Sequence, residues 1–194
     1  MFKHKIQKLA LAASSAMVAV VLGTASPVLA QDNACPQGGP DAPLALHTDW
    51  IMDGWERREG DPDFVFTDKM ARYYDLEDPA GVFYDNFAPG ETQLFRNGAR
   101  YGANWEDLQN AARSIRHGLT DGHEQMVDDN VASTTLGFVG LIDRLDGEEI
   151  AFDGRSQLGW ECDDGAWKIR HELNYAWVGE PEEIAPFLKQ PKAQ

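Results

Sequence analysis

Four runs of alternating apolar and polar residues follow one another in the second half of the chain, with a tight-turn sequence between each pair of runs. The runs are Leu119 to Val127, Val131 to Asp143, Ile150 to Cys162 and Ala166 to Val178, and the turns are Asp128-Asp129-Asn130, Asp146-Gly147 and Asp163-Asp164-Gly165. Aspartate, asparagine and glycine at these places are typical of hairpin turns. The pattern predicts a long antiparallel meander.

The last run shows the alternation most clearly. One set of alternate residues is mainly apolar or aromatic: Trp167, Ile169, His171, Leu173, Tyr175 and Trp177. The other set is polar: Lys168, Arg170, Glu172 and Asn174. Because successive side chains on a strand point to opposite faces, we expect the first set on a covered, concave face and the second set in water.

Shorter elements precede the meander. Helical spacing predicts a first helix from about Leu44 to Gly60 and a second that begins at Asp61-Pro62 and carries Phe66, Met70, Tyr73 and Tyr74 on one face. Val82 to Phe87 and Gln93 to Arg96 are predicted as a small strand pair, and Asn104 to His117 as a third helix that Gly118 ends. The order predicts an α+β domain in which a curved antiparallel sheet packs on three helices and leaves a hollow between them.

The first thirty residues have the pattern of a secretory signal peptide. Lys3, Lys5 and Lys8 precede the apolar run from Leu9 to Leu22, and small residues lead to a predicted cleavage after Ala30. We therefore expect a periplasmic or secreted protein without a membrane anchor. The remaining chain divides into a flexible leader (31–43), one domain (44–178) and a C-terminal tail (179–194), of which Ile184, Phe187 and Leu188 could dock on the domain.

The charge of the chain excludes some partners. The formal net charge is −15, and it becomes −18 when the three lysines leave with the signal. Such a surface repels nucleic acids and anionic membranes. No phosphate loop, nucleophile elbow or zinc motif is present, and Asp128-Asp129 and Asp163-Asp164 lack the spacing of a calcium loop. We expect no cofactor and no metal.

The two cysteines, Cys35 and Cys162, leave two alternatives open. In an oxidising compartment they can form a disulfide that closes a long loop. Alternatively, Cys162 is a small buried apolar residue and Cys35 is a free thiol in the leader, because sequence gives no distance between them.

Several segments resemble the SnoaL-like branch of the nuclear transport factor 2-like proteins. GRSQLGWECDDGAWKIRHEL resembles the closing hairpin of that family through Arg155, Trp160, Gly165, Trp167, Ile169 and His171. WERREGD from Trp55, LFRNGARYG from Leu94 and DDNVAST from Asp128 resemble further family segments in the same order. The resemblance implies a cone-shaped domain with a pocket between sheet and helices, and a homodimer formed through the sheet. It does not imply a particular reaction, because one fold hosts many functions.

The resemblance also suggests site residues. In enzymes of this family a histidine takes a proton while an aspartate orients it, and His117 and Asp61 fall near those places. The alternative is a histidine at a helix end and an aspartate that caps a helix. The predicted pocket residues are Trp55, Phe66, Tyr73, Phe138, Arg155, His171 and Tyr175, although aromatic residues of this kind also build cores and Arg155 can pair with an acid.

Three functions follow as hypotheses. The first is an exported domain that binds a small, largely apolar or aromatic molecule in the cone. The second is a lyase or isomerase, such as a dehydratase, dehydrohalogenase or cyclase, that uses His117 with Asp61. The third is a dimerisation or interaction module with a collapsed, dry cavity.

Overall fold

The computed structural model describes residues 34–189. The predicted signal peptide, its cleavage after Ala30 and the last five residues lie outside this range. No helix of the described part is long and apolar enough to span a membrane.

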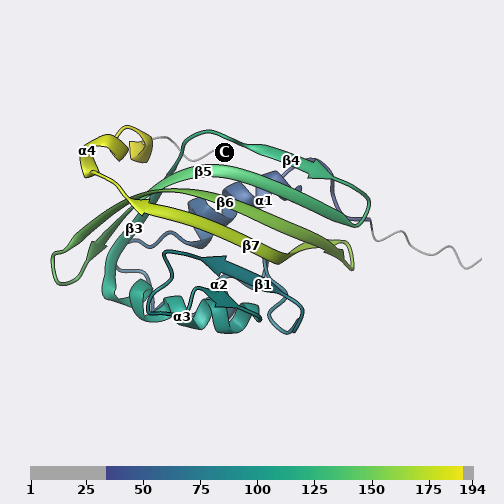
Figure 1. The fold of residues 1–194 in the computed structure, drawn as a ribbon, viewed down its shortest axis with the longest axis horizontal. Coiled ribbons are helices and arrows are strands. Elements are labelled where there is room, and N and C mark those ends of the chain that lie inside the picture. Colours follow the sequence, from purple (N-terminus) through teal and green to yellow (C-terminus); the bar gives the residue numbers. More distant parts are fainter. Residues whose placement is uncertain (1–33, 190–194) are drawn as a thin grey trace, which may run out of the picture. The chain divides into compact units, whose positions relative to one another are not determined.

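A single seven-stranded sheet organises the domain (Figure 1). Its strands are β1 (Val82–Asp85), β2 (Leu94–Phe95), β3 (Ala112–Leu119), β4 (Glu124–Val127), β5 (Val131–Arg144), β6 (Glu149–Asp163) and β7 (Ala166–Val178). The strand order is β2-β1-β7-β6-β5-β3, and β4 also pairs with β5. Of the predicted meander, β5, β6 and β7 are present and pair antiparallel, whereas only Leu119 and β4 of the run from Leu119 to Val127 are in strands. The sheet is mixed, however, because β1 joins β7 in parallel.

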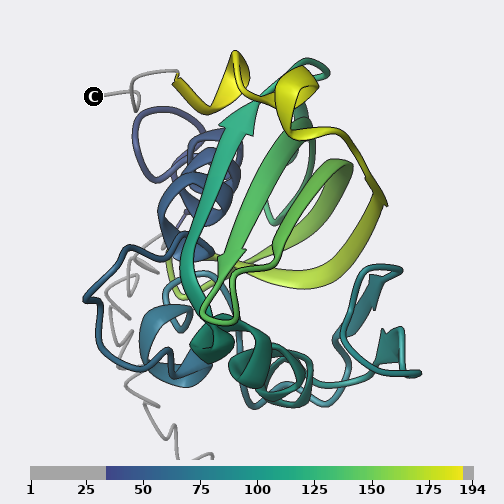
Figure 2. The same cartoon turned by 90° about the vertical axis from the view of Figure 1, so that its left-hand side faces the viewer.

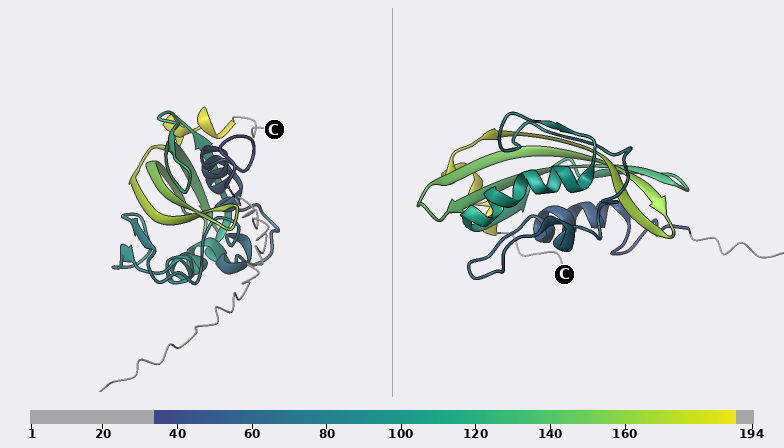
Figure 3. Two further views of the ribbon diagram at one scale, coloured as in Figure 1. Left: turned by 90° about the vertical axis from the view of Figure 1, so that its right-hand side faces the viewer. Right: turned by 90° about the horizontal axis from the view of Figure 1, so that it is seen from below.

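The helical segments differ from the prediction, since the first two predicted regions contain shorter helices. They are α1 (Pro43–Asp49), the π-helical turn η1 (Trp50–Gly54), α2 (Phe66–Lys69), α3 (Gly98–Ala111), α4 (Pro181–Ile184) and the 3₁₀ turn η2 (Phe187–Lys189). Figures 2 and 3 show α1, α2 and α3 on the same side of the curved sheet, so a layer of helices covers one sheet face.

The third helix begins and ends earlier than its sequence pattern predicted. The Asn97 side-chain oxygen accepts the Arg100 amide at 3.0 Å and caps the helix, which then starts at Gly98. Residues 112–119 form β3 instead of the last helical turns, because Ile115 and His117 pair with β5 opposite Ile142 and Gly140. The prediction that His117 ends a helix is therefore wrong. It is a strand residue.

A β-bulge in β7 reverses the face on which half of that strand was expected. Gly159 pairs with His171 and Trp160 with Ile169, so Arg170 is an extra residue on β7. One extra residue moves every later side chain to the opposite face. Glu172, Asn174 and Ala176 are consequently buried, and His171, Leu173, Tyr175 and Trp177 are exposed.

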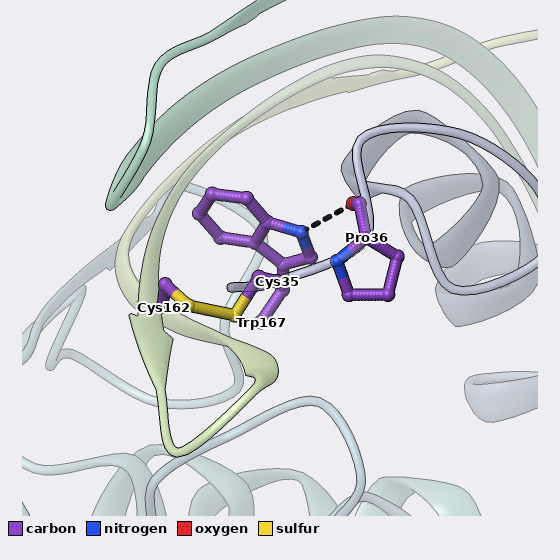
Figure 4. The surroundings of a disulfide bond; sticks show 4 residues. All are labelled: Cys35, Pro36, Cys162 and Trp167. Carbon is purple, nitrogen blue, oxygen red and sulfur yellow. Dashed lines mark hydrogen bonds between the residues drawn. A yellow bond between two sulfur atoms is a disulfide. The ribbon is translucent and has the colours of Figure 1, made fainter. Parts of the chain in front are cut away.

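Parts of both predicted terminal segments pack on the domain. Cys35 is buried and forms a disulfide with Cys162, and the Trp167 indole N–H donates to the Pro36 carbonyl at 2.7 Å (Figure 4). At the other end, Ile184 is buried in a small cluster with Val139, Leu141 and Ala151. The leader is thus held at Cys35, and the segment after β7 docks through the isoleucine.

Aromatic side chains dominate the core between sheet and helices. The fully buried residues include Trp50, Phe66, Tyr73, Tyr74, Phe83, Tyr101 and Trp167. The close approach of α3 to α2 requires a glycine at position 102, because a Cβ there would lie 1.9 Å from the Phe66 ring.

We therefore expect Gly102→Ala to destabilise the domain by about 2 kcal/mol or more, because the overpacking outweighs the gain in helix propensity. Urea denaturation measures the change. Gly98→Ala is a matched control in the same helix, since its added Cβ would meet ordinary contacts at 3.5 Å and beyond. Equal stability of the two variants would show that the packing of Phe66 against α3 is looser than the structure has it.

Candidate functional site

The domain has a cavity of about 60 Å³ between the sheet and the helices, which is partly open to the surface. Its walls are mainly aromatic and aliphatic, with rings from Trp50, Trp55, Phe87, Trp105, Phe138 and Phe152. The lining residues come from η1, α3 and strands of the sheet, so the cavity lies where these layers meet. Besides Tyr101 and the three tryptophans, four lining residues carry polar groups: Asp85, Gln109, His117 and Asn174.

A buried carboxyl group lies next to this cavity. Glu172 is fully buried. The hydroxyls of Tyr74 and Tyr101 and the Asn174 amide donate to its oxygens, each at 2.6 Å. The Trp50 indole N–H in turn donates to the Tyr74 hydroxyl at 2.7 Å. Glu172 thereby joins η1, α3 and the sheet through hydrogen bonds.

Asp85, at the end of β1, is the second carboxyl group of the same network and lines the cavity itself. One of its oxygens accepts the Phe87 amide at 2.7 Å. The other is 3.2 Å from both the Tyr101 hydroxyl and the Asn174 amide nitrogen, which also bond to Glu172. The two acids therefore share Tyr101 and Asn174 as neighbours.

Burial shifts the protonation of both acids. Desolvation raises the pKa of Glu172 to about 8, and the nearby Asp85 charge adds to that shift. Desolvation also raises the pKa of Asp85 to about 6, although its hydrogen bonds oppose the shift. Perturbed acids beside a cavity are a feature of functional sites.

Four buried polar atoms on residues that line the cavity have no hydrogen-bond partner within the described part of the chain. They are the indole nitrogens of Trp55 and Trp105 and the side-chain oxygens of Gln109 and Asn174. Buried polar groups in native proteins are nearly always hydrogen-bonded. Each of these atoms has almost no accessible surface, so none of them faces the open space of the cavity.

The structure brings only some of the predicted pocket residues to the cavity. Trp55 and Phe138 line it, whereas Phe66 and Tyr73 are core residues that do not.

Three further pocket predictions are corrected. Arg155, His171 and Tyr175 are exposed on the opposite face of the sheet, and Arg155 forms an ion pair with Asp121. The bulge in β7 explains why His171 and Tyr175 lie on the exposed face. Arg155 lies on the same face because it is paired with Tyr175 in the register between β6 and β7.

The two members of the predicted catalytic pair line different hollows. His117 is buried and lines the cavity, and its amide donates to Glu56 at 3.3 Å. Asp61 is exposed, accepts the Arg58 amide at 2.8 Å and lines a surface groove. His117 therefore belongs to the candidate site together with Asp85, a residue that the sequence analysis did not select.

Sequence reasoning missed Asp85, Tyr101, Glu172 and Asn174. Glu172 and Asn174 do stand two residues apart on one strand, which puts them on one face, but the alternation assigned that face to water. Only the register shift at the bulge in β7 turns these two side chains toward the core. No three His, Cys, Asp or Glu side chains among residues 34–189 are grouped so that they could hold a metal ion.

Comparisons with known proteins identify the fold. No protein-family model matches the chain, and no curated protein resembles it in sequence. A hexachlorocyclohexane dehydrochlorinase (LinA, type 2) matches 70% of this chain and 85% of its own at 12% identity, with a TM-score of 0.50. A conserved protein from Planctomyces limnophilus matches 70% of this chain and 95% of its own at 14% identity, also at 0.50.

A nuclear transport factor 2-like protein from Salmonella enterica serovar Typhimurium matches 54% of this chain and 72% of its own at 16% identity, with a TM-score of 0.46. The chain shares its α+β fold with the dehydrochlorinase and the Planctomyces limnophilus protein, which confirms the predicted fold class. At these identities the likeness extends to the fold alone.

Proposed function

We propose that this protein binds a compact small molecule in the cavity beneath its curved sheet. The lining of the cavity carries the proposal: its walls are mainly aromatic and aliphatic, and two buried titratable residues, Asp85 and His117, line it. A ligand with an apolar surface and one or two polar groups suits such walls, which is the usual composition of a small-molecule site.

The size of the cavity limits the ligand. Its volume is about 60 Å³, whereas an engineered cavity of about 150 Å³ binds benzene. An aromatic ligand, which the sequence analysis included, would require the walls to move. A molecule of a few non-hydrogen atoms fits the cavity as it stands.

The site would act after export. The signal-like sequence of residues 1–30 supports this location. So does the disulfide between Cys35 and Cys162, because disulfides persist in oxidising compartments.

Native mass spectrometry of the mature chain, purified from the exported fraction of its host without refolding, tests the binding. We expect a reproducible non-covalent adduct that is absent from the denatured protein. Ala176→Leu fills the cavity from β7 and should remove the adduct, whereas Tyr175→Phe on the exposed face of the same strand should keep it. Circular dichroism checks that both variants fold.

An adduct that survives Ala176→Leu would place the ligand elsewhere, and a wild-type protein without any adduct would contradict the proposal. The same spectra report the oligomeric state. The homodimer through the sheet stays a prediction, and the exposed Leu173, Tyr175 and Trp177 on the outer side of β7 are where a second copy would pack.

A further inference from the structure

Two of the side chains that line the cavity differ from the others in their contact with solvent. Phe87 and Leu108 are partly exposed, whereas all other described residues of the lining are buried. The cavity is partly open to the surface, and its opening lies where lining side chains also contact solvent. The mouth of the cavity is therefore between Phe87 and Leu108.

The two sides of this mouth belong to neighbouring elements. Leu108 lies in α3, and Phe87 lies in the loop 86–93 between β1 and β2. The side-chain amide of Asn104 donates to the Pro89 carbonyl at 3.1 Å, which holds the loop against the helix. Asn104 and Leu108 are four residues apart in α3, and residues at this spacing are neighbours on one helix face. The loop therefore lies beside the part of α3 that carries Leu108.

Hydrogen bonds fix the backbone on either side of the Phe87 ring. The Asn86 side chain accepts the Ala176 amide at 2.7 Å and donates to the Ala176 carbonyl at 2.8 Å. The Phe87 amide donates to the Asp85 carboxylate at 2.7 Å. The ring itself packs against Phe152, another lining residue, with 5.3 Å between the ring centroids. A rotation of the Phe87 side chain therefore changes the mouth without a movement of the backbone.

The inner walls of the cavity are less free to move. The Trp50 indole donates to the Tyr74 hydroxyl at 2.7 Å, and both residues are fully buried. The buried Phe138 ring contacts the rings of His117 and Phe152. A shift of these rings would disturb a close-packed interior. Phe87 has solvent on one side, so its ring moves at a lower cost.

We propose that Phe87 determines which ligands the cavity accepts, because its ring closes the mouth toward Leu108 and limits the ligand to a few non-hydrogen atoms. This inference rests on the proposed function and specifies the ligand size and the route of entry. The cavity of about 60 Å³ is too small for benzene, which an engineered cavity of about 150 Å³ binds. The Phe87 side chain carries a phenyl ring, so its removal leaves a space of that shape next to the cavity.

Calorimetric titration of the mature protein with benzyl alcohol tests the inference. Phe87→Ala should bind benzyl alcohol about tenfold more tightly than the wild type, since the burial of an apolar ring beside Phe152 supplies at least that much free energy. Phe187→Ala is the matched control, because it removes a partly buried ring from the cluster around Ile184 and not from the cavity. It should behave as the wild type. Circular dichroism checks that both variants fold.

Tryptophan fluorescence reports on the mouth without a ligand. Trp177→Phe removes the exposed tryptophan, and the tryptophans that remain are buried. Three of these line the cavity: Trp50, Trp55 and Trp105. In this background Phe87→Ala should raise the Stern–Volmer constant for acrylamide about twofold, because a close-packed wall no longer excludes the quencher. Phe187→Ala should leave the constant unchanged.

The outcomes separate this inference from the proposed function. If Phe87→Ala binds benzyl alcohol no more tightly than the wild type, Phe87 does not set the size limit, and a native adduct would still support the binding function. A wild-type protein without an adduct contradicts the binding function itself. If Phe87→Ala does not fold, Phe87→Leu decides, because unchanged quenching and unchanged affinity for benzyl alcohol in that variant overturn the inference.

Discussion

Glu172→Gln should remove most of the loss of stability that we expect for the wild-type protein between about pH 6.5 and pH 8. Burial raises the pKa of Glu172 to about 8, above its ordinary value of 4.5. Between these values the folded state holds a proton that the unfolded chain has lost. The stabilisation by this group is therefore fully present below pH 4.5 and disappears as the pH rises through the folded-state pKa. One such group changes the free energy of unfolding by at most about 1.4 kcal/mol per pH unit.

The glutamine keeps the shape of the acid but does not titrate, and its amide nitrogen donates where one carboxyl oxygen accepts. Urea denaturation from pH 6.5 to 9 should show a steep fall for the wild type and a much flatter profile for Glu172→Gln, because this range lies above the titration of His47. Glu124→Gln, on the exposed strand β4, should retain the wild-type profile. An unchanged slope in Glu172→Gln would show that Glu172 is ionised in the folded protein, with its charge compensated.

His47 changes the stability of the protein with pH in the opposite direction. It is fully buried, its ring nitrogens are 2.8 Å from the Thr134 hydroxyl and 3.0 Å from the Ser156 hydroxyl, and burial lowers its pKa to about 3. Between pH 6.5 and about pH 3, His47 binds a proton in the unfolded chain but not in the folded protein. The free energy of unfolding therefore decreases as the pH falls through this range. Glu172 therefore lowers the stability of the protein as the pH rises, and His47 lowers it as the pH falls. The two residues lie in different parts of the core.

Removal of the disulfide should have the second large effect. Cys35 and Cys162 are 127 residues apart in the sequence, and the chain-entropy relation gives about 5 kcal/mol for a loop of this length. The double variant Cys35→Ser/Cys162→Ser should lose about that much unfolding free energy, because its unfolded chain is no longer constrained. It should also release residues 34–42, whose attachment includes the contact between Pro36 and Trp167.

Denaturant unfolding with and without reductant measures this effect. Reductant should lower the wild-type midpoint to that of the double variant and leave the variant itself unchanged. If reductant does not alter the wild-type midpoint, the two cysteines are not bonded in the mature protein. A variant as stable as the oxidised wild type would instead mean that the loop is already ordered in the unfolded ensemble.

Local sequence predicts the strands better than the helices for a physical reason. The long runs of β5, β6 and β7 have clear alternation and their turns contain Asp, Asn and Gly, so their positions were predicted within a few residues. Ile115 fits a helical spacing equally well, and only the pairing of residues 112–119 with β5 decides that they form β3. Asn97 and Asn104 are both possible caps, and the structure uses Asn97.

The sequence alone determined the α+β class, the meander and its turns, since these depend on period-two patterning and turn chemistry between near neighbours. Only the tertiary structure decided which face of β7 is covered, because a single extra residue at Arg170 reverses the alternation. That reversal brings Glu172 and Asn174 to Asp85 and Tyr101, from three separate elements. The candidate site depends on strand register, and register is a property of the assembled sheet.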